Sequence, residues 1–182
     1  MEKSVIERCL AGDRKAQEVL YKSIAPKVKG WCMRYARTVF EVEDIVQESF
    51  IKIFKNLKNY SNTGPFDAWA RRIVINTAID SYKSNLFSDN QVNIENTTEI
   101  EVGFAKITDT VTEAELLKIL NQLPNGYKIV FNMYAIEGYS HKEIAEILKI
   151  SEGTSKSQLS KAREAIKKLL VQYNYIENDE RE

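Results

Sequence analysis

The fold of this chain is decided by the segment Gly138-Tyr-Ser-His-Lys-Glu-Ile-Ala-Glu-Ile-Leu-Lys-Ile-Ser-Glu-Gly-Thr-Ser-Lys-Ser-Gln-Leu-Ser-Lys-Ala-Arg-Glu164. Ser140 followed three residues later by Glu143 is a capping box, and it predicts the start of one helix. Ser151 predicts the start of a second helix directly after it. Two short helices joined by a tight corner form a helix-turn-helix.

The second predicted helix is polar and basic. Leu159 and Ala162 are its apolar residues for packing. Its hydrogen-bonding side chains are Thr154, Lys156, Ser157, Gln158, Ser160 and Lys161. Such side chains at the start of a helix can contact base edges in the major groove of DNA. Two-helix corners also occur in proteins that never touch DNA, so this segment alone leaves both interpretations open.

Composition excludes several other classes of protein. The chain has 182 residues, of which 43% are hydrophobic and 29% charged, as in ordinary globular proteins. Its charged N-terminus lacks an apolar signal region, and no apolar run approaches the ~20 residues of a membrane span. We therefore expect a cytoplasmic protein without membrane insertion.

The cysteines and the single histidine do not indicate a metal, a cofactor or an enzyme. Cys9 and Cys32 are far apart, with no further cysteine or histidine at metal-ligand spacing. His141 follows the predicted cap Ser140, where we expect an exposed residue of the first helical turn. A catalytic histidine there would lack an identifiable nucleophile or orienting carboxylate.

The net charge of zero conceals two basic blocks. Residues 1–83 hold 15 Lys and Arg against 10 Asp and Glu, and residues 113–173 hold 9 against 7. Residues 84–112 hold 1 against 5, and residues 174–182 hold 1 against 4. An acidic spacer between basic blocks makes nucleic-acid contact more plausible for each block than the overall charge suggests.

The sequence predicts an all-α chain of two small helical domains joined by an acidic flexible linker. In residues 1–83, Asp13 is expected to cap one helix, and Pro26 to lie in the first turn of another. Strong periodicity predicts a further helix over residues 41–57, and another helix is expected over residues 66–83, after a turn-rich break at residues 59–65. The linker is predicted over residues 84–112, a four-helix domain over 113–173, starting at a Thr112–Glu115 capping box, and an acidic tail over 174–182.

Two predicted helices carry polar faces with more than one interpretation. On the helix 66–83 one face holds Trp69, Arg72, Asn76, Asp80 and Lys83. This face is either a platform for a nucleic-acid strand or a solvated surface with Trp69 turned partly inward. The loop of residues 60–65 before it is either a pocket for an unstacked base or a plain surface turn.

On the helix 41–57 the side away from the apolar stripe carries Glu43, Asp44, Gln47, Glu48 and Lys52. This side either meets another protein or is solvated. Asp44 and Glu48 lie one turn apart, but no third ligand supports a metal or acid/base pair.

Several segments resemble the sigma-70 family of transcription initiation factors. Glu43-Asp-Ile-Val-Gln-Glu-Ser-Phe-Ile-Lys-Ile-Phe54 and Phe66-Asp-Ala-Trp-Ala-Arg-Arg-Ile-Val-Ile-Asn-Thr-Ala-Ile-Asp80 are similar to its second conserved region. The stretch from Leu123 to Phe131, with the motifs between Glu137 and Arg163, is similar to its fourth. The order and short length are those of the extracytoplasmic function subgroup.

The resemblance implies partners and sites. The protein would join core RNA polymerase, contacting its clamp coiled coil and flap regions, and direct it to promoter DNA. The residues implied to dock on the clamp are Asp44, Gln47, Glu48 and Phe50. Those implied to recognise and melt the minus-ten element are Tyr60, Asn62, Phe66, Trp69, Arg71, Arg72, Asn76 and Asp80.

The helix-turn-helix is implied to bind the minus-thirty-five element. The residues concerned are Lys156, Ser157, Gln158, Ser160, Lys161 and Arg163. The chain departs from the common family pattern at Ser155, where valine is usual, and at Gln158 and Ser160. The resemblance further implies an anti-sigma partner, and an acidic linker that threads through the polymerase.

Two other functions compete with this interpretation. A stand-alone helix-turn-helix regulator, with the first block as a sensing or dimerising domain, explains residues 138–164 but leaves the first-block matches as coincidence. An anti-sigma or adaptor protein that binds no DNA leaves the basic second helix unexplained.

Overall fold

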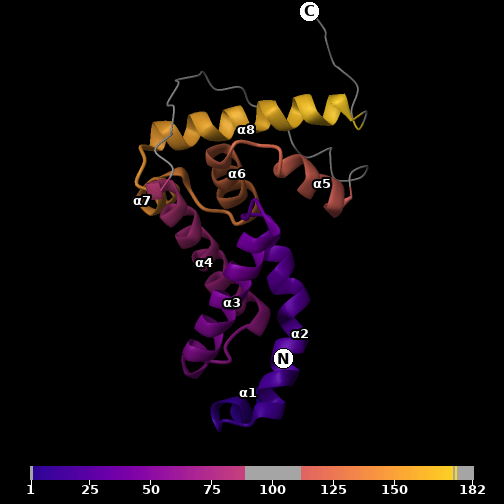
Figure 1. The fold of residues 1–182 in the computed structure, drawn as a ribbon. Coiled ribbons are helices and arrows are strands. Elements are labelled where there is room, and N and C mark those ends of the chain that lie inside the picture. The colour runs from indigo at the N-terminus through magenta and orange to yellow at the C-terminus, as the bar shows by residue number, and fades with distance from the viewer. Residues whose placement is uncertain (1, 89–111, 174, 176–182) are drawn as a thin grey trace, which may run out of the picture. The chain divides into compact units, whose positions relative to one another are not determined.

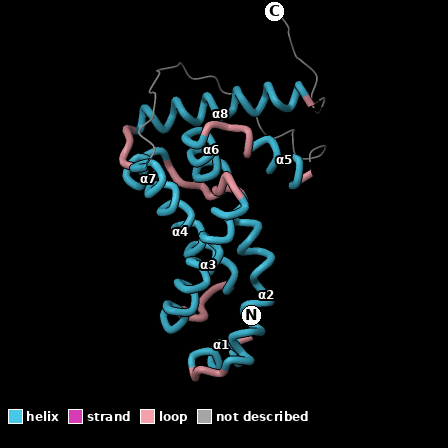
Figure 2. Tube along the Cα trace, viewed as in Figure 1, coloured by secondary structure: helices cyan, strands magenta, loops and turns pink. Residues whose placement is uncertain are grey.

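The computed structural model describes residues 2–88, 112–173 and 175. Every regular element in these ranges is a helix, which confirms the all-α prediction (Figure 2). The chain divides into two compact units, Met1–Asn90 and Gln91–Glu182. Of the predicted linker, residues 89–111 lie outside the described residues, as does the predicted tail apart from Tyr175.

The first unit is built on three helices that pack pairwise against one another, with a fourth, short helix on one of them. Its elements are α1 (Lys3–Leu10), α2 (Arg14–Met33), α3 (Val39–Asn56), the 3₁₀ turn Leu57–Asn59 and α4 (Phe66–Ser88). The helices α2, α3 and α4 form the bundle, and α1 packs on α2 (Figure 1). The bundle buries apolar side chains from each helix, among them Leu20, Ile24, Ile45, Ile53, Val74 and Ile79.

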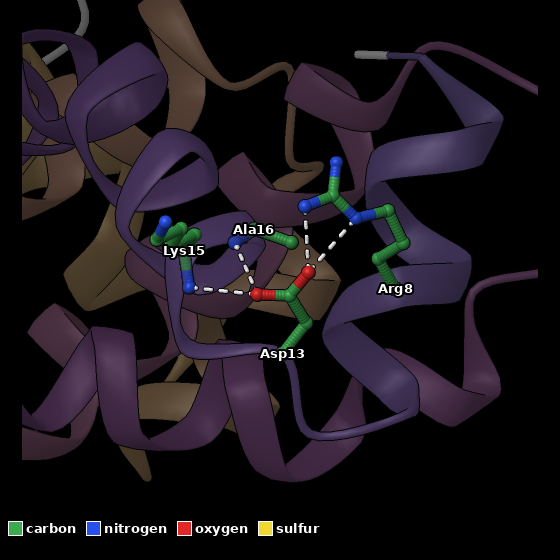
Figure 3. A network of polar contacts seen from close by, with 4 residues as sticks. All are labelled: Arg8, Asp13, Lys15 and Ala16. Carbon is green, nitrogen blue, oxygen red and sulfur yellow. Dashed lines mark hydrogen bonds and ion pairs between the residues drawn. The ribbon is translucent and has the colours of Figure 1, made fainter.

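The predicted cap of α2 is confirmed and is part of a small polar network (Figure 3). Asp13 accepts hydrogen bonds from the backbone N–H groups of Lys15 and Ala16, at 2.9 and 3.3 Å. Its second carboxylate oxygen accepts from the Arg8 guanidinium at 2.9 and 2.6 Å, and this bond is the main cause that lowers the pKa of Asp13. The network therefore holds the end of α1 against the start of α2.

The expectation that Pro26 lies in the first turn of a separate helix is wrong, because α2 continues through this residue to Met33. Proline deprives the carbonyl of Lys22 of its helical donor, which costs about 3 kcal/mol in a helix interior. Leu20, Ile24 and Val28 are nevertheless all buried, at four-residue steps across the proline. Burial of each such side chain contributes about 1.5–3 kcal/mol, so packing outweighs the missing hydrogen bond.

The second unit has the predicted four helices, three of which pack on the longest. They are α5 (Glu113–Leu120), α6 (Asn125–Phe131), α7 (His141–Leu148) and α8 (Glu152–Gln172). The helices α5, α6 and α7 all contact α8 (Figure 1). The capping box of Thr112 and Glu115 at the start of α5 is present as predicted.

Two helix ends differ from the prediction. The helix predicted to end at residue 83 continues to Ser88, and residues 84–88 include no glycine or proline that would stop a helix. The sequence pattern also predicts one helix over residues 126–136, but α6 passes at Asn132 into a π-helical turn, Asn132–Ile136. Such turns widen a helix locally and are common at functional sites.

Candidate nucleic-acid interface

The helix-turn-helix corner is fixed by its own caps. The Ser140 side chain accepts a hydrogen bond from the Glu143 backbone, and the Glu143 carboxylate accepts from the Ser140 hydroxyl and N–H at 2.7 and 2.8 Å. The bond from the Ser140 side chain, followed by that from its backbone, lowers the pKa of Glu143. Lys149 ends α7 in the left-handed conformation, with φ 57°, and Ser151 caps α8 by accepting from the Thr154 N–H at 2.9 Å. Both predicted helix starts are confirmed.

Four of the six residues predicted to contact the minus-thirty-five element share the solvent side of α8. The buried side of this helix carries Ser155, Leu159, Ala162, Ile166 and Leu170. On the other side lie two adjacent rows at four-residue steps, Lys156 with Ser160 and Ser157 with Lys161. Lys156 is exposed, and the other three are partly exposed. The domain thus presents a basic and hydroxyl-bearing surface of the kind that contacts bases and phosphates.

The other two predicted residues lie at the flanks of this surface. A Cβ atom at Gly126 of α6 would come within 3.1 Å of the Gln158 Nε2 atom, so the Gln158 amide packs against that glycine. The Arg163 guanidinium carbon lies 5.9 Å from the centre of the Tyr134 ring, within the range of a cation–π contact. Both side chains are therefore engaged by their own domain.

His141 is not the exposed first-turn residue that the sequence suggested. Its Nδ1 atom lies 2.9 Å from the hydroxyl oxygen of Ser155, and its ring stacks on Tyr134 with centroids 4.5 Å apart. Ser155 is 0% exposed. This serine, which the sequence marked as a departure from the common family pattern, therefore lies inside the corner and not on the solvent side of α8.

An aromatic cluster marks the start of α4 in the first unit. The rings of Tyr60, Phe66 and Trp69 lie 5.3–5.4 Å apart, pairwise. Phe66 is only 3% exposed, so its predicted place in a DNA-contacting set is corrected to a buried support for Trp69. Trp69 is half-buried, so part of its ring stays accessible to solvent.

The loop before α4 and the polar face of α4 lie beside this cluster. The Tyr60 hydroxyl donates to the Gly64 carbonyl, the Ser61 and Thr63 hydroxyls are 2.8 Å apart, and Asn62 has a positive φ of 57°. The loop is thus a tight turn closed on itself. On α4, Arg71 is half-buried, whereas Arg72, Asn76 and Asp80 are exposed.

The face of α3 predicted to meet a protein is more apolar than the sequence reasoning recognised. Asp44, Gln47 and Glu48 are exposed as expected. Two apolar side chains were missed, Phe40 at 79% and Ile51 at 60% exposed. The spacing of residues 40, 44, 47 and 51 at helical steps of four, three and four was the signal that could have found them.

Phe50 does not belong to this exposed face. It is 6% exposed, and its ring lies 4.4 Å from that of Tyr21 on α2. Its predicted role in docking is therefore corrected to packing behind the face.

In residues 2–88 and 112–173, no group of three or more His, Cys, Asp or Glu side chains is arranged to hold a metal ion. In the same ranges, no helix combines the length and apolarity needed to cross a membrane.

Comparisons with known proteins agree with this architecture. Residues 20–86 match the model of sigma-70 region 2, and residues 113–166 match that of sigma-70 region 4. The chain is 30% identical over 176 residues to the ECF RNA polymerase sigma-E factor of Haemophilus influenzae, covering 91% of this chain and 93% of that protein. The chain belongs to the extracytoplasmic function (ECF) sigma factors of the sigma-70 family.

Further relatives extend along nearly the whole of this sigma factor. The ECF RNA polymerase sigma factor SigW of Bacillus subtilis is 30% identical over 181 residues, covering 93% of this chain and 97% of that protein. The RNA polymerase sigma-H factor of Pseudomonas aeruginosa is 29% identical over 185 residues, covering 93% of each. Proteins of this family are transcription initiation factors and not enzymes.

Proposed function

We propose that this sigma factor binds core RNA polymerase through the exposed face of α3 and directs it to promoters in the cytoplasm. In this proposal α8 enters the major groove of the minus-thirty-five element, and the start of α4 opens the minus-ten element. The observation that carries it is the solvent side of α8. There Lys156, Ser157, Ser160 and Lys161 lie together on a helix whose start is fixed by Ser151.

The proposed opening of DNA needs no catalytic group. Unstacking one base costs a few kcal/mol, and stacking of a base on an aromatic side chain returns about 1–3 kcal/mol. Trp69 offers such a ring, held by Tyr60 and Phe66, while Arg72 lies one turn along the helix for phosphate contact. The geometry at the start of α4 thus supports capture of a displaced base.

Docking through α3 is supported by the chemistry of its exposed face. Phe40 and Ile51 would leave water on binding, and a side chain of each kind contributes about 1.5–3 kcal/mol when fully buried. The carboxylates of Asp44 and Glu48 lie between them and favour a partner with basic side chains. A partner surface with basic and apolar side chains would therefore complement this face.

The test is transcription with purified components. The full-length protein is mixed with core polymerase, the complex is isolated, and a promoter library is transcribed and its start sites are mapped. We expect a stable complex and initiation at a restricted set of sequences. Binding to duplex DNA without binding to core polymerase would instead support a stand-alone regulator, and absence of both core binding and initiation would refute the proposal.

A further inference from the structure

A hydrogen-bonded pair joins the two helices of the helix-turn-helix. His141 lies in the first turn of α7, and Ser155 lies in the first turn of α8. The imidazole Nδ1 and the hydroxyl oxygen are 2.9 Å apart, and the serine is fully buried. A buried hydroxyl that loses its hydrogen-bond partner is destabilised, so this contact favours one arrangement of the two helices.

The imidazole ring is also held by a stacking contact on its face. The Tyr134 ring stacks on it at 4.5 Å, with an interplanar angle of 21°. Tyr134 belongs to the π-helical turn, and the Arg163 guanidinium of α8 lies 5.9 Å from the centre of its ring. The side chains of Tyr134, His141 and Ser155 thus connect the π-helical turn, α7 and the start of α8.

The position of Ser155 makes this connection relevant to DNA contact. Ser155 directly precedes Lys156 and Ser157, and the next buried residue of α8, Leu159, lies a full turn further on. A serine side chain is too small to fix the start of the helix by apolar packing. The hydrogen bond to His141 supplies an anchor at the turn that carries the first groove-facing residues.

A small rotation of α8 would be enough to disturb these contacts. Side chains reach about 5–6 Å from the helix axis, so a roll of about 15° displaces their ends by about 1.4 Å. Binding side chains must be held within about 0.5 Å and 10–20° of their productive geometry. Loss of the anchor would therefore reach Lys156 and Ser157, which directly follow Ser155 along α8.

We propose that His141 and Ser155 are positioning residues that set the roll of α8, and through it the affinity and base preference at the minus-thirty-five element. This inference rests on the proposed function, in which α8 enters the major groove. It assigns to both residues a role in DNA binding without contact to DNA.

Four substitutions separate the hydrogen bond from the ring stack. His141→Phe keeps a ring against Tyr134 but removes Nδ1, whereas His141→Asn keeps a polar atom near the position of Nδ1 and removes the ring. Ser155→Ala removes the hydroxyl, and Ser155→Thr retains it. Ser155→Thr and His141→Asn are therefore the two rescue variants, because each retains a hydrogen-bonding group. His141→Asn serves as the rescue variant if the added methyl group of threonine does not fit.

Each variant is assembled with core polymerase, and its binding to minus-thirty-five duplexes, including a set with single base changes, is measured well below its unfolding temperature. We expect His141→Phe and Ser155→Ala each to lower affinity by about fivefold to tenfold and to alter the order of preferred bases. The double variant should be no worse than either single one, because both remove the same bond. At least one rescue variant should stay within about threefold of the original protein.

The outcomes distinguish this inference from the function on which it rests. Unchanged affinity and base preference in His141→Phe and Ser155→Ala, with only a lower unfolding temperature, would show a purely structural bond and overturn the inference. Additive losses in the double variant would also overturn it. If the unsubstituted protein, assembled with core polymerase, binds no promoter, the proposed function itself is wrong.

Discussion

Replacing Lys156 and Lys161 together with alanine tests the α8 surface most directly. Both lysines lie on the solvent side of the helix, five residues and therefore about 7.5 Å apart along its axis. Removal of their positive charges should weaken promoter binding and leave binding to core polymerase intact. The physical reason is that lysines which neutralise phosphates release counterions from the DNA.

The magnitude follows from the number of charges. Each neutralised phosphate contributes about 0.9 to the slope of log affinity against log salt, so two lysines contribute about 1.8. Between about 50 and 200 mM salt, the original protein should therefore lose about tenfold more affinity than the double variant. The assay is fluorescence anisotropy of a labelled minus-thirty-five duplex with the complex of sigma factor and core polymerase, across this range of salt.

A matched control removes two exposed lysines elsewhere in the same unit. Lys118 lies on α5, and Lys168 lies on α8 three turns beyond Lys156, paired with Glu164 at 2.6 Å. A helical pair of this kind contributes about 0.2–0.5 kcal/mol, so its loss should leave the fold intact. The same salt slope in both double variants, or an equal loss of promoter and core binding, would refute the assignment of Lys156 and Lys161.

Three further predictions concern the core, the α3 face and pH. Ile166→Ala removes a fully buried side chain and should lower the free energy of unfolding of the second unit by about 2–5 kcal/mol, measured by urea denaturation. Phe40→Ala and Ile51→Ala should each weaken core polymerase binding by about fivefold to thirtyfold in a titration, with an unchanged unfolding temperature. Bonds from the Thr112 side chain, the Tyr175 side chain and the Thr112 backbone lower the pKa of Glu115 from 4.5 to about 2. The stabilising contribution of the Glu115 charge is therefore present above pH 4.5 and is lost as the pH falls towards 2. The difference in unfolding temperature between the original protein and Glu115→Gln should decrease to zero over this range.

Each of these predictions has a result that contradicts it. A loss below 1 kcal/mol in Ile166→Ala would mean that α8 is not packed as described. Unchanged polymerase affinity in both α3 variants, compared with the buried-side control Phe50→Leu, would remove this face from the docking surface. A difference between the original protein and Glu115→Gln that is constant from pH 7 to pH 3 would show that the charge of Glu115 contributes nothing.

Local rules predicted the helix starts well and the surroundings of single side chains less well. The caps at Asp13, Thr112 and Ser140 were predicted because their hydrogen bonds span only two or three residues. The separate helix expected to start near Pro26 was wrong because the cost of a proline inside a helix is outweighed by packing against other helices. The exposed setting expected for His141 was wrong because its partner Ser155 lies 14 residues away, on the next helix.

The sequence by itself determined the all-α class, most helix starts and the resemblance to the sigma-70 family, since these depend on periodicity, capping and motif order along the chain. Only the tertiary structure decided which residues of each motif face outward. Phe50 and Phe66 lie inside the first unit, whereas Phe40 and Ile51 are exposed on its surface. The physical reason is that burial depends on contacts between helices, and a helix's own period cannot specify which neighbours cover it.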